Sequence, residues 1–364
     1  MSSGDIKVSV IMPIYNAIDY LRPAIDSVID QTLRELELIC VDDGSTDGSL
    51  HVLKEYRERD PRVRIMTTQS NAGAAAARNK GLAGARGEYV IFLDADDFVE
   101  PTLLEQLYAA ACSDRLDITV AKYDLYNDKK ACFERTVKCD KGEIFETDRV
   151  VSRSTHPSII FQCTTGYVWN KLFRRSFLVE KGLSFDSELY VFEDTYFVMT
   201  ALALASAVGK VQQVLVHHRI YSDQAKKRLF KKYYGQVPEI YVRIKRFLMA
   251  QGAYVPLTYS FLTLSASRSY KIYNLLSGDS KSEFWDAYHG TYAAELAWDK
   301  ADAEDFESEE IRDFVANVLL YTHKQYERRE REGKTVRIDR VGRRLRRREL
   351  NERLKSLFVG EKRG

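Results

Sequence analysis

The feature that most constrains the fold is a short apolar segment, Tyr89–Leu93, that ends directly in aspartates. A run of this length, rich in aromatic and β-branched residues, is typical of a strand buried on both faces of a sheet. Asp94, Asp96 and Asp97 follow within four residues. Unpaired carboxylates are costly to bury, so we expect the strand to emerge at a sheet edge there. The carboxyl ends of parallel strands are where α/β folds place ligand sites.

Two interpretations of this acidic turn stay open from the residues alone. An Asp-x-Asp pair can hold a hard divalent cation, which in turn can bind a diphosphate. Alternatively, Asp96 or Asp97 caps a helix that begins near Pro101.

The residues before this turn predict alternating strands and helices. We expect strands over Lys7–Ile14, Leu36–Val41 and Val63–Met66, and helices over 19–29, 50–59 and 74–83. The resulting β-α-β-α-β-α-β order predicts a parallel, doubly wound α/β sheet.

The second strand also ends in acids, so two acidic turns are expected at one sheet edge. These are Asp42 and Asp43, in a Gly- and Ser-rich turn where Asp47 can cap the next helix. The turn after the first strand, 13–16, lacks the glycines of a dinucleotide site. An acidic site that binds an anionic nucleotide requires an intervening metal.

Four segments together resemble family 2 glycosyltransferases of the GT-A fold. They are VSVIMPIYN ending at Asn16, VDDGSTD ending at Asp47, NAG-x5-N-x-G ending at Gly81, and FLDADD ending at Asp97. The resemblance covers about the first 110 residues. It implies a Rossmann-like, mostly parallel sheet flanked by helices and a UDP-sugar donor.

The resemblance also implies roles for particular residues. The residues expected around the uracil and ribose are Pro13, Tyr15, Asn16, Asp42 and Asp43, and those expected near the phosphates and sugar are Arg78, Asn79 and Ala95. Asp94 and Asp96 are the expected ligands of Mg²⁺ or Mn²⁺, with Asp96 the more direct one. A solvated helix face is the alternative for Arg78.

A second group of candidates lies beyond residue 110, in the half expected to bind the acceptor. Trp169, Asn170 and Lys171 resemble a segment placed beside the sugar in bacterial polysaccharide transferases of this family, although Trp169 can also be a core residue. Glu193 and Asp194 begin an apolar helix, where carboxylates complement the helix dipole. The apolar side chains around them can also raise a carboxylate pKa toward that of a useful base. The resemblance favours Asp194 as the general base, with Glu193 second.

His218 and Arg219 follow a strand expected over 211–216. His218 is a candidate metal ligand, although a hydrogen-bonded structural histidine is the alternative. Arg219 is expected to neutralise the leaving diphosphate.

The C-terminal third changes character. We expect a catalytic domain over 1–225, divided into a nucleotide-sugar half (1–110) and an acceptor half (111–225). An α-helical accessory region over 226–335, a candidate surface for homo-oligomer formation, and a basic amphipathic tail over 336–364 follow. Residues 324–364 carry 16 Lys/Arg and 7 Asp/Glu, a net charge of +9 against +2 for the whole chain. Such a tail suits an anionic membrane surface, and a solvated coiled-coil end is the alternative. Nucleic acid is not expected, because Phe358 is the one aromatic residue among the tail's arginines.

Composition suggests the compartment. The five cysteines are dispersed, which fits reduced thiols in the cytoplasm. No apolar run reaches the roughly 20 residues of a membrane span, and the polar start predicts no signal peptide. We therefore expect a cytoplasmic protein, with the tail on the inner face of the plasma membrane.

Together these observations predict an inverting, metal-dependent glycosyltransferase. It would move a hexose or N-acetylhexosamine from a UDP-sugar to a hydroxyl of a saccharide or lipid-linked saccharide, in surface polysaccharide or glycolipid synthesis. The alternatives are a nucleotidyltransferase, which would want a glycine-rich triphosphate loop after the first strand, and a non-catalytic protein that binds nucleotide sugar or nucleic acid.

Overall fold

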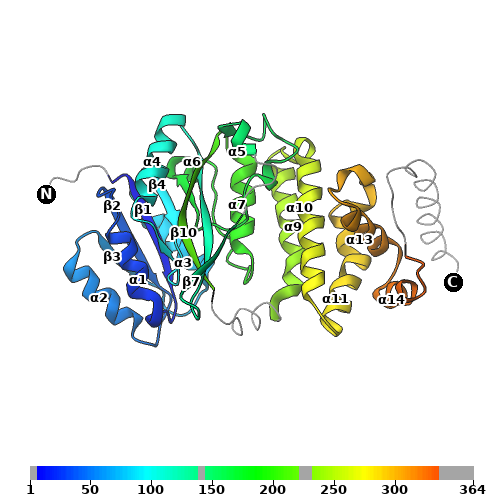
Figure 1. Cartoon of the computed structure of the whole chain (residues 1–364), viewed down its shortest axis with the longest axis horizontal. Coiled ribbons are helices and arrows are strands. Elements are labelled where there is room, and N and C mark those ends of the chain that lie inside the picture. The colour runs from blue at the N-terminus through cyan, green and yellow to red at the C-terminus, as the bar shows by residue number, and fades with distance from the viewer. Residues whose placement is uncertain (1–5, 138–143, 221–231, 336–364) are drawn as a thin grey trace.

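The computed structural model describes residues 6–137, 144–220 and 232–335. An α/β part and a C-terminal helical part lie side by side along the long axis of the molecule (Figure 1). The predicted tail helix over 340–358 lies outside the described residues, as does Cys139.

The α/β part is built on one mixed sheet. Its order is β3-β2-β1-β4-β9-β6-β10-β5, with β7 beside β6 and β8 beside β10. The strands are β1 Val8–Ile14, β2 Leu36–Asp42, β3 Val63–Thr67, β4 Tyr89–Phe92, β5 Phe98–Val99, β6 Ile118–Asn127, β7 Cys132–Val137, β8 Val150–Val151, β9 Lys171–Arg174 and β10 Val208–Ile220. The first four strands are mutually parallel, as predicted, and so are β6 and β10. Strand β9 is antiparallel to both of its neighbours.

Strand register brings the predicted turns together. Ile14 of β1 pairs with Asp42 of β2, and Ile11 of β1 pairs with Phe92 of β4. The turns that follow β1, β2 and β4 therefore meet at one edge of the sheet, as parallel strands require.

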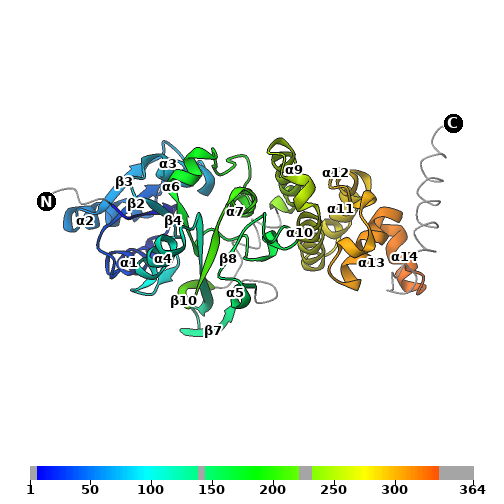
Figure 2. The same ribbon diagram turned by 90° about the horizontal axis from the view of Figure 1, so that it is seen from above.

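Helices cover both faces of this sheet (Figure 2). Helices α1 (Ile18–Ile29) and α4 (Leu103–Asp114) lie on one face, and α3 (Ala74–Gly84), α6 (Arg175–Glu180) and α7 (Glu193–Leu204) lie on the other. Helix α2 (Ser49–Arg59) packs with the first group. Val10 and Met12 enter the core beneath α1 and α4, and Ile11 enters the core beneath α3 and α7. This alternation explains why a continuous apolar sequence forms a strand buried on both faces.

The C-terminal part is helical, as predicted. Its main helices are α9 Val237–Ala250, α10 Tyr254–Leu275, α11 Asp279–Ala287, α13 Glu309–Leu320 and α14 His323–Arg331, and its short turns are Tyr234–Gln236, Tyr288–Tyr292, Ala293–Glu295, Trp298–Lys300 and Ala303–Asp305. Between the sheet strands lie two further short helices, α5 Ile144–Thr147 and Ile160–Gln162. The apolar residues of α9, α10 and α13 belong to the same core cluster as those of α3 and α7. The division at residue 225 stays a prediction, because the two parts share one continuous core.

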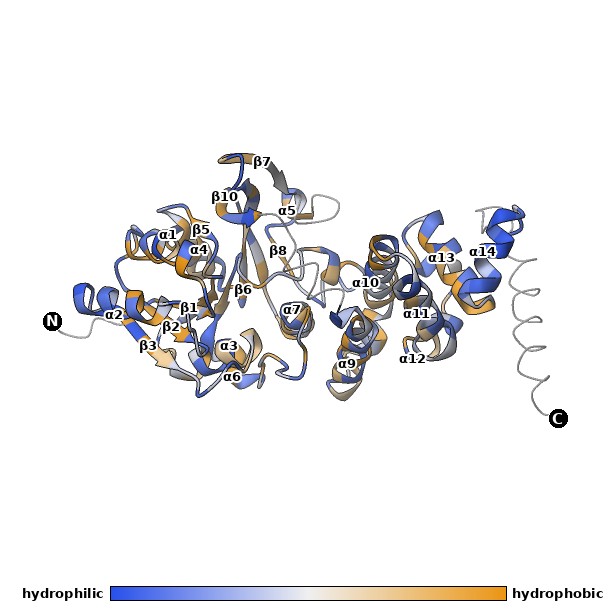
Figure 3. Ribbon diagram, turned by 90° about the horizontal axis from the view of Figure 1, so that it is seen from below, coloured by the Kyte–Doolittle hydropathy of each residue, from blue (hydrophilic) through white to orange (hydrophobic). Residues whose placement is uncertain are grey.

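Most helices carry both hydrophilic and hydrophobic residues, and α14 is mainly hydrophilic (Figure 3). Helix α10 has 22 residues, yet neither it nor any other helix in the described ranges is both long and apolar enough to cross a membrane.

Candidate active site

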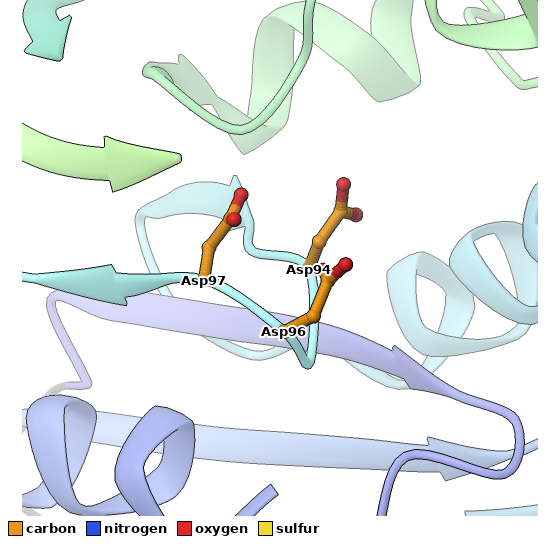
Figure 4. A group of neighbouring side chains, drawn as sticks. All are labelled: Asp94, Asp96 and Asp97. Atoms are coloured by element: carbon orange, nitrogen blue, oxygen red, sulfur yellow. The ribbon is translucent and has the colours of Figure 1, made fainter. Parts of the chain in front are cut away.

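Three carboxylates gather in the loop between β4 and β5 (Figure 4). One oxygen each from Asp94, Asp96 and Asp97 lies within 4.8 Å of the others. Asp94 and Asp96 are half-buried and Asp97 is buried. Helix α4 begins only at Leu103, after Thr102, so the alternative that Asp96 or Asp97 caps this helix is wrong.

Asp97 is held from behind by β10. The backbone N–H of Arg219 donates to its carboxylate at 2.8 Å, and Nδ1 of His218 lies 3.0 Å from both of its oxygens. Burial raises the pKa of Asp97 to about 6; His218 opposes this shift, and Asp96 and Asp94 add to it. The sequence placed Asp97 in the acidic turn, but we had not singled it out as a site residue.

His218 matches the alternative interpretation, a hydrogen-bonded histidine, because its Nδ1 contacts Asp97. A role of His218 as a further metal ligand stays a prediction, since a metal-binding histidine commonly bonds a carboxylate through its other ring nitrogen.

Arg219 also braces this turn. Its Nε donates to the backbone carbonyl of Asp96 at 2.9 Å, and its guanidinium pairs with Asp128. The guanidinium also lies about 5 Å from the ring centres of Tyr20 and Phe98. These contacts fix the backbone that carries Asp96, and the predicted role of Arg219 toward a leaving diphosphate stays a prediction.

Arg78 connects the acidic turn to α7. Its Nη2 lies 2.8 Å from Asp94 and its Nη1 lies 2.7 Å from Glu193. The residue is only 5% exposed, so a solvated helix face is the wrong interpretation. Burial alone would lower the pKa of Arg78, but Asp94, Glu193 and Asp194 outweigh it and raise that pKa.

Asp194 is the second residue of α7, beside Glu193. It accepts a hydrogen bond from the N–H of Thr195 at 2.7 Å. Burial raises its pKa to about 7; the charge of Glu193 adds to this shift and that of Arg78 opposes it. A carboxyl group with this pKa is half ionised near neutral pH, which suits a general base. The position also complements the helix dipole, as the alternative interpretation requires.

The turns after β1 and β2 are tied to each other. Asn16 has a positive φ of 50° and accepts the N–H of Thr46 at 2.7 Å. Asp47 accepts the N–H groups of Ile18 and Ser49, the first residues of α1 and α2. Gly48 and not Asp47 holds the N-cap position of α2, so Asp47 contacts the start of this helix from one residue before the predicted cap.

Asp42 and Asp43 differ in how their carboxylates are satisfied. Asp43 accepts the N–H groups of Ala72 and Gly73. Asp42 is 2% exposed, and its Oδ1 has no hydrogen-bond partner among the described residues. An unsatisfied buried acceptor is costly unless a ligand supplies the donor. Pro13 beside it is half-buried and Tyr15 is 50% exposed.

Two predicted residues near the donor have structural surroundings. The Asn79 side chain makes two hydrogen bonds of 2.8 Å to the backbone of Phe185 and so ties α3 to the segment before α7. Ala95 is buried within the acidic turn. Their roles at a donor sugar stay predictions.

The segment of Trp169, Asn170 and Lys171 lies inside the protein. These residues are 2%, 0% and 0% exposed, and the Lys171 ammonium donates to Oδ1 of Asn170. The prediction that they contact a sugar directly is therefore wrong, and the core alternative for Trp169 is correct. Strand β9 carries Lys171 into the middle of the sheet, where both faces are covered.

The exposed ring in this segment is Tyr167. It is 41% exposed and stacks on Trp169, with ring centres 5.1 Å apart, and Trp169 stacks in turn on His218 at 5.0 Å. Sequence analysis did not select Tyr167 as a site residue. A cleft of about 950 Å³ begins at Tyr167 and at Thr195, next to Asp194.

The central sheet has the GT-A arrangement of strands. The acidic turn follows one of its strands, and Arg78 and Asp194 come from helices that cover one of its faces. The chain matches the model of the glycosyl transferase family 2 over residues 9–178. It belongs to the family 2 glycosyltransferases and is a glycosyltransferase with the GT-A fold.

Particular relatives agree with this assignment. EpsH of Bacillus subtilis (strain 168), whose name describes it as a glycosyltransferase, is 34% identical over 244 residues, which are 66% of this chain and 69% of EpsH. The poly(ribitol-phosphate) beta-glucosyltransferase of Bacillus spizizenii (strain W23) is 27% identical over 341 residues, which are 90% of this chain and 51% of that protein. The structure of S. aureus TarS 1–349 in complex with UDP-GlcNAc has a TM-score of 0.71 at 21% identity, covers 92% of this chain and 94% of TarS 1–349, and shares its fold.

Proposed function

We propose that this protein transfers a hexose or N-acetylhexosamine from a UDP-sugar to a hydroxyl of a saccharide acceptor, with inversion at the anomeric carbon. The observation that carries the proposal is the Arg78 bridge. It fixes a three-carboxylate turn and the Glu193–Asp194 pair at opposite ends of one guanidinium. The groups that would bind the donor and the group that would take the proton are thereby held in a fixed position relative to each other.

The nucleotide would lie over the turns that follow β1 and β2. The unpartnered Oδ1 of Asp42 can accept the N–H of a uracil, and the half-exposed Tyr15 offers a ring beside it. UDP-GlcNAc bound to TarS, which has the same fold, supports a UDP-sugar as donor.

The acidic turn fits a divalent cation. Asp94, Asp96 and Asp97 offer only carboxylate oxygens, the donors that Mg²⁺ and Mn²⁺ prefer. Asp96 and Asp94 would hold the ion, supported by Asp97. When bound, the ion would neutralise the negative charge that develops on the departing diphosphate.

Asp194 would accept the proton of the attacking hydroxyl. As that O–H bond breaks, the acceptor oxygen bonds to the anomeric carbon, the bond from this carbon to the β-phosphate oxygen breaks, and UDP leaves with that electron pair. A single displacement of this kind inverts the anomeric configuration and requires no covalent enzyme intermediate. Glu193 and Arg78 would position Asp194 and hold its pKa near neutrality.

The acceptor would belong to a surface polymer or glycolipid. The beta-glucosyltransferase relative, whose name specifies poly(ribitol-phosphate), supports a polymer acceptor. Contact of the basic residues 340–358 with an anionic membrane is part of the same proposal, as is a cytoplasmic location. The family assignment disfavours a nucleotidyltransferase, and the intact acidic turn disfavours a protein that only binds nucleotide sugar.

The decisive variant is Asp194→Asn, which keeps the size of the side chain and removes the base. We expect loss of transfer from UDP-sugars to a membrane extract, while the affinity for UDP measured by calorimetry stays within about twofold. Near-normal transfer by this variant would rule out Asp194 as the base.

A further inference from the structure

The cleft beside Asp194 contains two cations that the proposed chemistry does not use. Arg268 and Lys271 lie three residues apart on α10, hence on one face of the helix, and both line the cleft. The same cleft is lined by Tyr167, by Phe192 just before α7 and by Thr195 in the first turn of α7. The cleft therefore joins residues on either side of the proposed base in the sequence to the helical part of the chain.

Within the described part of the chain, neither of these cations forms an ion pair with a carboxylate. By contrast, Arg243 and Arg246 of the neighbouring helix α9 both do. Among the described residues, the one acidic side chain that lines the cleft is Asp279, at the start of α11, where helix N–H groups offset its charge. Arg268 is half-buried, and burial together with the charge of Arg268 lowers the pKa of Lys271. Two like charges on one helix face, the half-buried Arg268 and the exposed Lys271, favour a bound anion.

The cations also lie within electrostatic range of the site. Burial and the charge of Asp194 raise the pKa of Tyr167, and the charge of Arg268 opposes that shift. Tyr167 therefore lies within electrostatic range of both Asp194 and Arg268. Its exposed ring offers a stacking surface for a sugar, and the two cations line the same cleft.

We propose that Arg268 and Lys271 form an anion subsite for the acceptor, so that the preferred acceptor chain carries a phosphodiester or carboxylate next to the unit that is glycosylated. This inference rests on the proposed function, because it assigns Asp194 to the acceptor hydroxyl. It names a substrate class, an anionic saccharide or polyol chain, that the acidic turn does not determine.

The test compares three end-labelled oligomers of equal length: a glycerol phosphate oligomer, an oligogalacturonate and a neutral maltooligosaccharide. Each is titrated by fluorescence anisotropy into the full chain loaded with UDP, at low and at high NaCl concentration. We expect at least one anionic oligomer to bind about tenfold or more tightly than the neutral one, with the difference shrinking in high salt. The stronger of the two anionic oligomers identifies the group.

The variant is Arg268→Gln with Lys271→Gln, which keeps side-chain length and removes both charges. Its matched control is Arg246→Gln with Lys300→Gln, which removes two charges from residues that do not line the cleft. We expect the first pair to abolish the preference for anions and the control to keep it.

Three outcomes would overturn the proposal. The first is that no oligomer binds or that all three bind equally. The second is that the double variant of Arg268 and Lys271 binds the anionic oligomers as the wild type does. The third is that these cations capture phosphatidylglycerol vesicles while no oligomer binds, which would indicate a lipid headgroup as the ligand. UDP affinity, measured in parallel, separates this inference from the proposed function. A loss of UDP affinity in the first pair would be a fourth outcome against the proposal, because it would place the cations at the donor diphosphate.

Discussion

Arg78 offers the sharpest test of how the site is held together, through the substitution Arg78→Ala. The guanidinium is 5% exposed and forms ion pairs of 2.8 Å with Asp94 and 2.7 Å with Glu193. Its removal leaves these carboxylates and Asp194 without their shared cation. Breaking a buried pair from one side costs about 3–5 kcal/mol, and the partial exposure of Asp94 favours the lower end, about 3 kcal/mol.

The loss should depend on pH, because it comes from ionised carboxylates. Arg78 lowers the pKa of Asp194, which already stands at about 7. Without Arg78, that pKa rises further, so protonation relieves the repulsion as the pH falls through this range. The destabilisation should therefore be largest at about pH 8 and should shrink toward about pH 5.5.

The assay is urea unfolding followed by tryptophan fluorescence at both pH values. Arg78→Lys keeps one charge and should lose less stability than Arg78→Ala, whereas the exposed Arg246→Ala should stay within about 0.5 kcal/mol of the wild type. The reasoning is that the buried Arg78 stabilises the carboxylates of Asp94, Glu193 and Asp194. A loss of unfolding free energy below about 1 kcal/mol at the higher pH, or a loss that does not change with pH, would refute it.

Two further predictions concern catalysis. Because burial raises the pKa of Asp194 to about 7 and the base acts when ionised, kcat/KM should rise with pH and level off above about pH 7.5; a profile that is flat from about pH 5.5 to 8.5 contradicts the assignment. Asp96→Ala should abolish the difference in UDP affinity between Mn²⁺ and EDTA, measured by calorimetry; an unchanged Kd in Mn²⁺ would count against the acidic turn as the metal site.

Much of the nucleotide half was predictable because its signals are local. Apolar runs, helical spacing and the acids at strand ends give the strands, the helices and the edge where they meet. Asp47 is an example: its place before a helix predicted a cap, and it does accept the N–H of Ser49, although Gly48 holds the N-cap position itself. The Arg78 bridge was not predictable, because Glu193 lies 115 residues farther along the chain.

The acceptor half was harder to predict for a topological reason. Nothing local in the residues around Trp169 indicates that β9 inserts antiparallel between β4 and β6, which buries the strand on both faces. Trp169 therefore lies at the centre of a ring stack, and the exposed ring of this segment is Tyr167, two residues earlier. His218 stacks on the other side of Trp169 and also contacts Asp97. The Tyr167 ring that lines the cleft is therefore connected to the acidic turn through Trp169 and His218. We therefore expect a displacement of the Tyr167 ring to shift the carboxylates of the proposed metal site, through the Trp169–His218 stack. Neither the segment around Trp169 nor the acidic turn reveals this connection in the sequence.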